Sequence, residues 1–307
     1  MPSNARSPIV EIIGKSEKLV SRGKTAEAIE ALDKGIDRHP ASSDLYVARG
    51  NVYLCERNYR FACRDYTIAL RLHPDNPRIF FSLGLVAYLM NGTETAMKCY
   101  TRAIELDSGY ADAYYNRGIL HDDMENFQAA IEDYTKAIEL EPDMTAAWNN
   151  RGNDWIDLGE YGKALEDFNE VVRLNPNREK AYGNRGYARQ MTGDAEGALE
   201  DYARAIEMDR DDACTYANRG RFLMERGDAE GAVADYSELV RLAPMNPETY
   251  RLRAEAYRAL GNMEAAEADQ KKAEAFGPAP GSPAAETVRE QASEPSEGTS
   301  APSETAI

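Results

Sequence analysis

The sequence has few basic residues and no long apolar run, and both shortages limit what it can bind. Its 307 residues include 36 lysines and arginines against 53 aspartates and glutamates, a formal net charge of -17. Binding to nucleic acid needs a basic surface, so we expect no nucleic-acid partner and instead a protein or peptide partner with basic residues. No stretch approaches the roughly 18 apolar residues of a membrane span, so we expect no membrane contact.

The N-terminal residues, MPSNARSPIVEIIGKSEKLV, also lack the marks of a secretory signal. No apolar core of about 7 to 15 residues stands before a small-residue cleavage site. We therefore expect a cytoplasmic protein.

Cysteine and histidine are too few and too scattered to indicate a redox, metal or catalytic site. The cysteines form no C-x-x-C pair and have no histidine at ligand spacing, so they fit packing residues better than a disulfide or a metal site. Only His39, His73 and His121 could act as an acid or base, and no nucleophile, base and orienting residue come together. We expect no cofactor, no metal and no enzymatic activity. The four cysteines are Cys55, Cys63, Cys99 and Cys214.

What the sequence does contain is one 34-residue segment written many times. Residues 111–144, ADAYYNRGILHDDMENFQAAIEDYTKAIELEPDM, return 34 residues later, with Tyr114 matched by Trp148 and Gly118 by Gly152. A fixed period of this size indicates an array that grows by stacking and has no single core to outgrow. The frame holds without an insertion over eight units, which start at Ile9, Ser43, Pro77, Ala111, Thr145, Glu179, Ala213 and Pro247.

This frame predicts three regions. Residues 1–8 are a polar leader, residues 9–280 are the repeats, and residues 281–307 are rich in proline, serine and glutamate. A segment of that composition buries too little apolar surface to fold, so we expect a disordered tail. A short helix around residues 284–291 could cap the last repeat.

Each unit has the pattern of two helices. In the fourth unit, Tyr114, Gly118 and His121 lie on one helical stripe, and Ala130 and Tyr134 open a second stripe after a break. The break is often a glycine, which suits the left-handed residue that ends a helix, and a proline commonly follows the second helix. The small residues let two helices approach closely while the aromatics fill the space between them.

The order of aromatic, glycine, alanine, aromatic, alanine and proline resembles the tetratricopeptide repeat family over about residues 9–280. The resemblance implies an all-α fold, a right-handed α-solenoid of about eight helix-turn-helix repeats whose first helices line a concave groove. We therefore expect a non-catalytic scaffold or adaptor that binds an extended peptide segment of a partner in that groove.

A second hypothesis is self-assembly into a homo-oligomer through the N-terminal repeat. Its first helix is apolar at Ile9, Val10, Ile12 and Ile13, and no preceding repeat covers it.

An arginine and an aspartate recur at fixed positions in six of the eight units. The arginine stands before the glycine of the first helix, where the family usually has leucine, and the third unit has Leu83 and Cys99 in the two positions. Pairing with the preceding unit would leave Arg117 facing Cys99, whereas pairing within a unit leaves no partner missing. We predict six structural ion pairs inside repeats: Arg49–Asp65, Arg117–Asp133, Arg151–Asp167, Arg185–Asp201, Arg219–Asp235 and Arg253–Asp269.

Four successive units have asparagine at the sixth position of the first helix. Asparagine is a mediocre residue for a helix interior, so its repeated use needs a reason. Its amide offers a donor and an acceptor, which match the N–H and C=O of an extended peptide. The series is similar to the asparagine ladder in the superhelix of O-GlcNAc transferase; the alternative is that the amides bond only to neighbouring side chains. The four residues are Asn116, Asn150, Asn184 and Asn218.

The family geometry implies that the second, fifth, sixth, ninth, twelfth and thirteenth residues of each first helix face the groove. Carboxylates at these positions of the fourth and fifth units predict a site that attracts lysine or arginine, or else simply a solvated acidic face. Four apolar residues of the third unit predict an apolar pocket, or else ordinary packing between helices, which we favour for the last of them: Phe81, Leu85, Tyr88 and Leu89. Beyond the asparagine series, the candidate peptide-binding residues are Tyr115, Asp122, Asp123, Asn149, Asn153, Asp157, Tyr187 and Arg221.

Overall fold

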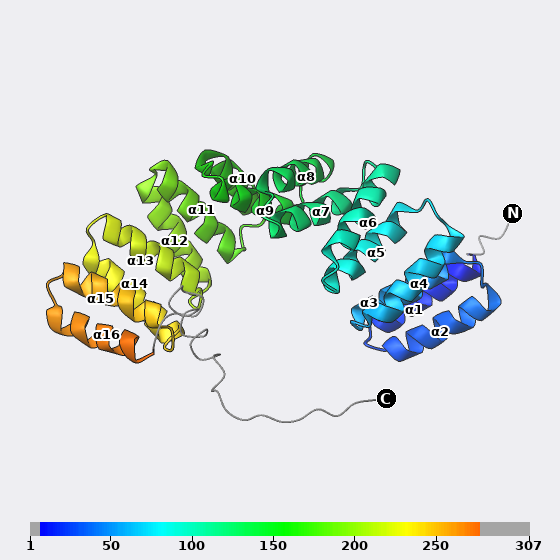
Figure 1. Cartoon of the computed structure of the whole chain (residues 1–307), viewed down its shortest axis with the longest axis horizontal. Coiled ribbons are helices and arrows are strands. Elements are labelled where there is room, and N and C mark those ends of the chain that lie inside the picture. The colour runs from blue at the N-terminus through cyan, green and yellow to red at the C-terminus, as the bar shows by residue number, and fades with distance from the viewer. Residues whose placement is uncertain (1–6, 277–307) are drawn as a thin grey trace, which may run out of the picture. The chain divides into compact units, whose positions relative to one another are not determined.

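A computed structural model describes residues 7–276 of the chain (Figure 1). Over this range the chain forms sixteen α-helices and no strand. The predicted tail of residues 281–307, the proposed capping helix at residues 284–291 and most of the predicted leader lie outside the described residues.

The chain divides into two compact units, Met1–Pro176 and Asn177–Ile307. The first unit holds five helix pairs, and in each pair the second helix packs along the first. The helices of this unit are α1 (Pro8–Val20), α2 (Thr25–Arg38), α3 (Ser43–Cys55), α4 (Tyr59–Leu72), α5 (Pro77–Leu89), α6 (Thr93–Leu106), α7 (Ala111–Asp123), α8 (Phe127–Leu140), α9 (Thr145–Asp157) and α10 (Tyr161–Leu174).

The second unit holds three helix pairs built in the same way. The predicted all-α solenoid of eight helix-turn-helix repeats is confirmed, because every 34-residue period contributes one such pair. The first helices begin at the residues that open the sequence units, except that α1 begins at Pro8, one residue before Ile9. The helices of the second unit are α11 (Glu179–Thr192), α12 (Ala195–Met208), α13 (Ala213–Glu225), α14 (Ala229–Leu242), α15 (Pro247–Ala259) and α16 (Met263–Ala275).

A left-handed residue ends the first helix of every repeat. In five repeats it is a glycine, such as Gly159 with φ of 74°, but repeats two to four have Arg57, Asn91 and Glu125 with φ of 55°, 60° and 58°. The residue after it donates its N–H back to a carbonyl five residues earlier, as Asn126 does to His121 at 2.8 Å. This bond satisfies a carbonyl that the helix end leaves open and sets the turn into the second helix.

Close contact between the paired helices depends on a glycine that faces an aromatic ring. A Cβ added at Gly118 would lie 2.7 Å from Cε1 of Tyr134, whose side chain is fully buried. The aromatic ring therefore occupies the space that a larger residue would need. The end repeats differ: Ser16 with Leu32 stands in the first, and Ala254 with Gln270 in the last.

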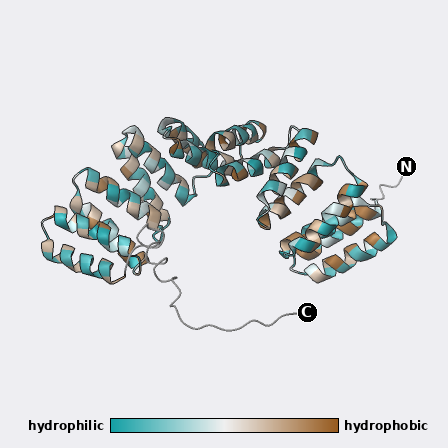
Figure 2. Cartoon of the chain, in the orientation of Figure 1, coloured by the Kyte–Doolittle hydropathy of each residue, from teal (hydrophilic) through white to brown (hydrophobic). Residues whose placement is uncertain are grey.

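Hydrophobic residues occur in every repeat and do not gather in one central core. Figure 2 shows hydrophobic and hydrophilic segments alternating along the helices of both units. In the first repeat, Ile9, Ile12 and Ile13 pack against the buried cluster that includes Leu32, whereas Val10 is 54% exposed. Most of the apolar face of α1 is thus used inside its own repeat and its neighbour.

Candidate functional site

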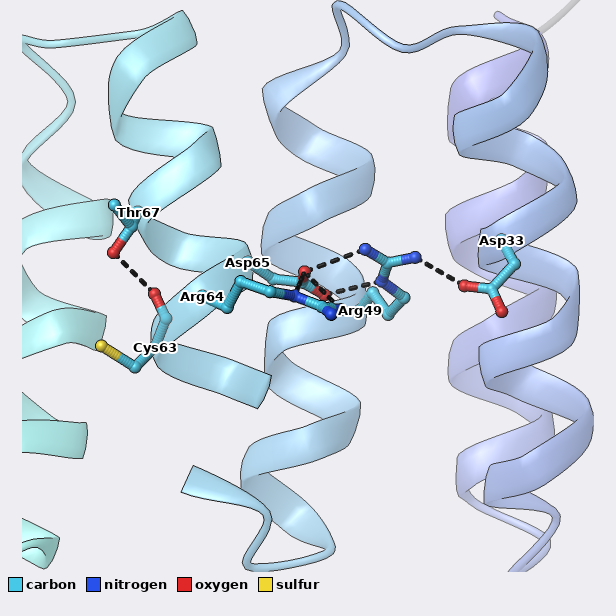
Figure 3. Close-up of polar contacts among 6 residues, drawn as sticks. All are labelled: Asp33, Arg49, Cys63, Arg64, Asp65 and Thr67. Carbon is cyan, nitrogen blue, oxygen red and sulfur yellow. Dashed lines mark hydrogen bonds and ion pairs between the residues drawn. The ribbon is translucent and has the colours of Figure 1, made fainter. Parts of the chain in front are cut away.

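Six arginine–aspartate pairs join the first helix of a repeat to its second helix. In the second repeat, Nε and Nη2 of Arg49 donate to the two carboxylate oxygens of Asp65 at 2.6 and 2.9 Å (Figure 3). The aspartate side chains of the six pairs are 0 to 7% exposed, so these are buried two-bond ion pairs. The same geometry occurs in Arg117–Asp133, Arg151–Asp167, Arg185–Asp201, Arg219–Asp235 and Arg253–Asp269.

Four of these arginines also bond to the preceding repeat, a contact that the sequence reasoning missed. Nη1 of Arg49 donates to Asp33 of α2 at 2.6 Å, so one guanidinium links three helices (Figure 3). Burial opposes the charge of Arg49, but the hydrogen bonds that it donates to both carboxylates outweigh this effect and raise its pKa. In three other repeats a hydroxyl takes the place of Asp33 and accepts the hydrogen bond from Nη1 of the arginine. The distances are 3.3 Å for Arg117–Thr101, 2.9 Å for Arg151–Thr135 and 3.3 Å for Arg253–Ser237.

A cavity of about 570 Å³ lies on the first helices α1, α3 and α5. Its wall includes apolar residues such as Ile13 and Val47 together with polar Asn51 and the free thiol of Cys55. The apolar pocket expected in the third repeat is replaced by core packing at Phe81, whose ring lies 5.7 and 5.1 Å from those of Tyr100 and Tyr110. Tyr88 packs against the same core.

In the first unit the two asparagines of the series bond to nearby groups and remain half-buried. Nδ2 of Asn116 donates to the backbone carbonyl of Asp112, one turn earlier in α7, at 2.8 Å. Nδ2 of Asn150 lies 3.4 Å from the hydroxyl of Tyr115 and 3.5 Å from that of Tyr134. These last two contacts are at the long limit of a hydrogen bond and are weak. Asn149 is 8% exposed and donates to Oδ1 of Asn150 at 3.4 Å.

In the second unit the candidate residues differ more in their surroundings. Asn184 and Asn218 are both half-buried. Tyr187 packs against the cluster that contains Tyr202, so its ring belongs to the core of its repeat. Arg221 is exposed, and its charge lowers the pKa of Tyr202, which burial raises on balance.

The acidic residues of the fourth and fifth repeats come together on α7 and α9. Asp123 and Asp157 are exposed, and Asp122 is half-buried. Burial raises the pKa of Tyr88 on α5, and the carboxylate of Asp123 raises it further. Asn153, also on α9, is exposed. The same unit therefore presents amides and carboxylates on neighbouring first helices.

The sequence reasoning missed one member of this group, Asp154. Its side chain is fully buried. Neither of its two carboxylate oxygens has a hydrogen-bond partner among the described residues. Burial, with the adjacent carboxylate of Asp122, raises the pKa of Asp154 to about 8. The signal was available: Asp154 is the tenth residue of its first helix, where Leu120, Ala188 and Phe222 stand buried in other repeats.

These helix pairs define the chain as an array of tandem helix-turn-helix repeats. Sequence models of the family described as tetratricopeptide repeat match residues 111–144, 145–178 and 179–212. A model described as TPR repeat matches residues 88–124 and 220–261, and together the matches cover more than half of the chain. The chain belongs to the tetratricopeptide repeat family.

The relatives support this assignment at the level of the fold. A TPR repeat-containing thioredoxin from Arabidopsis thaliana is 31% identical over 80 residues, which are 26% of this chain and 21% of that protein. The chain thus spans about a fifth of that relative's length.

Two solved structures share the architecture. The C-terminal part of a TPR repeat-containing protein from Cytophaga hutchinsonii has a TM-score of 0.62 at 21% identity, covering 77% of this chain and 97% of that one. YrrB, described as a TPR protein with an unusual peptide-binding site, has a TM-score of 0.55 at 22% identity, covering 62% of this chain and 99% of that one.

The family is one of protein-interaction scaffolds, and the fold of this chain is of that kind. No helix within residues 7–276 is long and apolar enough to cross a membrane.

Proposed function

We propose that the chain is a non-catalytic adaptor that binds an extended, basic segment of a partner protein along its first helices. The observation that carries this proposal is the combination on α7 and α9. Asn116 and Asn150 hold the same position on two successive first helices, and the carboxylates of Asp122 and Asp157 lie on the same two helices.

The amides have bonding capacity that a peptide can use. Asn150 holds its two tyrosine hydroxyl partners only at 3.4 and 3.5 Å, so an N–H···O bond to a ligand backbone replaces weak contacts. Asn116 uses one N–H on its own helix, which leaves its carbonyl oxygen to accept from a peptide N–H.

The spacing of the helices suits an extended ligand. Packed helices lie about 8–10 Å apart, and an extended chain advances roughly 3.3 Å per residue. Successive amides then meet about every third residue of the ligand. Such contacts bind the backbone of the ligand whatever its sequence. Preference among ligand side chains therefore comes from the neighbouring carboxylates, which favour lysine and arginine.

Capture of partners from the native cell, followed by mapping of the bound segment, tests the proposal. The double variant Asn116→Ala/Asn150→Ala should bind the mapped peptide more weakly while its thermal melt stays close to that of the wild type. Asn126→Ala is the matched control, because this exposed asparagine immediately precedes α8 and makes no side-chain capping bond. Equal affinity of the double variant and the control would remove the amides from the binding site.

Self-assembly through the first repeat has less support. Three of the four apolar residues at the start of α1, Ile9, Ile12 and Ile13, already pack inside the array, and only Val10 is largely exposed. Light scattering of a chain without residues 1–42 distinguishes the two hypotheses, because only an oligomer held together by this repeat would dissociate.

A further inference from the structure

Asp154 is a polar exception at a position that the array otherwise fills with apolar side chains. In the second to eighth repeats other than the fifth, the tenth residue of the first helix is buried and apolar: Val52, Val86, Leu120, Ala188, Phe222 or Ala256. Only the fifth repeat has a carboxyl there. Burying such a group without a partner is costly, so a purely structural reason for it is lacking.

The neighbours of Asp154 are acidic or neutral. Asp122 on α7 and Asp157 on α9 both act electrostatically on Asp154, and Asp123 adds to the negative field at Asp122. On α8, burial raises the pKa of the Tyr134 hydroxyl, and the charges of Asp122 and Asp154 raise it further. No lysine or arginine is among the described groups that act on Asp122 or Asp154.

A pair of adjacent carboxyls in these surroundings holds one proton between them. Burial is the first cause that raises the pKa of both Asp122 and Asp154. The carboxyl of Asp122 raises the pKa of Asp154 further, whereas Asp154 lowers that of Asp122, so the proton belongs mainly to Asp154. The protonated Asp154 can then donate a hydrogen bond to Asp122, which removes the conflict of two negative charges at close range.

We propose that Asp122, Asp154 and Asp157 form the subsite for one lysine or arginine side chain of the bound segment, and that the cation displaces the proton held by the Asp122–Asp154 pair. This inference rests on the proposed function and names the chemistry of its ligand. The exchange is balanced: the ligand brings one positive charge, one proton leaves Asp154 for solvent, and the local net charge is unchanged.

The roles of the three residues differ because their exposure differs. Asp122 and Asp157 are accessible and contact the incoming cation, whereas Asp154 is fully buried beneath them and acts through Asp122 as a positioning residue. A metal ion is a poorer occupant, since the described residues include no group of three or more histidine, cysteine, aspartate or glutamate side chains arranged to hold one.

The direct test is a carboxyl ¹³C NMR titration of the full chain labelled at its aspartates. The probes are N-acetyl-arginine amide and its uncharged analogue N-acetyl-citrulline amide, and Asp154→Asn identifies the resonance by its loss. We expect the Asp154 midpoint to fall by about one pH unit with the arginine probe and to stay in place with citrulline. Equal shifts with both probes, no shift with either, or a midpoint near that of a free aspartate would overturn the proposal.

A second measurement keeps this inference separate from the proposed function. The mapped partner peptide is titrated calorimetrically in two buffers with different heats of ionisation, with its basic residues intact or replaced by citrulline. We expect proton release with the wild type, no release with Asp154→Asn, and about tenfold weaker binding of the basic peptide to Asp154→Asn above pH 8. Peptide binding without release or discrimination defeats the subsite alone. Failure of any peptide to bind defeats the adaptor, while the arginine probe still judges the subsite.

Asp154→Leu is a second variant of this position, for use if Asp154→Asn does not fold. Leucine is the residue that the fourth repeat has at this position, in Leu120, so the packing is expected to accept it. Because Asp122 and Asp157 remain in this variant, a preference for the arginine over the citrulline peptide that is smaller than in the wild type supports the subsite, and an unchanged preference contradicts it.

Discussion

Arg151 and Asp167 lie sixteen residues apart in the chain and form two parallel hydrogen bonds, Nε to Oδ2 at 2.8 Å and Nη2 to Oδ1 at 2.7 Å. The aspartate side chain is 4% exposed and the arginine side chain 15%. Each such pair ties the two helices of one repeat together, and the remaining guanidinium nitrogen extends the tie to Thr135 of the preceding repeat.

Arg151→Ala should therefore destabilise the array strongly. The substitution leaves the carboxylate of Asp167 buried without its partner, a change that typically costs about 3 to 5 kcal/mol. Thermal melts followed by circular dichroism measure the loss. Arg173→Ala is the control, because Arg173 forms its ion pair with Glu170 at the surface, and its melt should match that of the wild type. An unchanged midpoint for Arg151→Ala would mean that the pair contributes nothing.

Gly118→Ala should also destabilise the fold, for a steric reason. The new Cβ would lie 2.7 Å from the ring of the fully buried Tyr134, and overpacking of this kind costs about 1 to 3 kcal/mol. The matched control is Gly162→Ala in α10, where a Cβ meets nothing within 4 Å. That variant should gain about 0.5 to 1 kcal/mol from the lower backbone entropy of the unfolded chain. Urea unfolding of both variants checks the opposite signs.

The 34-residue period was enough to predict the helices and their pairing. Periodicity reports which residues face the partner helix, so the slot of Gly118 and the pairing of Arg151 with Asp167 could be derived without coordinates. The period alone could not predict the hydrogen bond of Arg151 to Thr135, because that bond depends on how the repeat packs against the preceding one.

The candidate site was less predictable than the fold. The bonds of Asn150 to Tyr115 and Tyr134 depend on side-chain rotamers in two repeats, which no repeat pattern specifies. Asp154 could have been found from its position, because a carboxyl at an otherwise apolar slot violates the pattern. The tenth residue of the first helix is not among the positions that the family geometry places on the groove, so that geometry alone does not select Asp154.

Glu125→Gly should stabilise the fourth repeat. Glu125 has φ of 58°, where an L-residue with a Cβ is strained, and five other repeats have glycine at this turn position. Relief of that strain outweighs the entropy that glycine loses on folding, so we expect a gain of about 0.5 to 1 kcal/mol. Glu141→Gly serves as the control, because Glu141 ends α8 with φ of -133° and has no strain to relieve. If both variants lower the melting midpoint, the left-handed turn of Glu125 is not a source of strain.

Asp154→Leu should stabilise the first unit, and the gain should grow with pH. The folded chain raises the pKa of Asp154 to about 8, whereas an unfolded aspartate titrates near about 3.9. Between those values the folded state binds a proton that the unfolded state lacks, so the contribution of Asp154 to stability declines as the pH rises through this window. Leucine removes both the titration and the cost of burying the carboxyl.

Denaturant unfolding at pH 5, 7 and 9 measures that dependence. The free energy of unfolding of the wild type should fall relative to Asp154→Leu at each step, and the difference should stop growing above pH 9, where Asp154 is ionised in both states. Glu132→Leu is the control, because Glu132 is exposed on α8 and is not among the groups that act on Asp122 or Asp154, so it should leave the pH dependence unchanged. A constant difference between wild type and Asp154→Leu over the whole range would show that Asp154 is already ionised in the folded chain, and the shared proton would have to be abandoned.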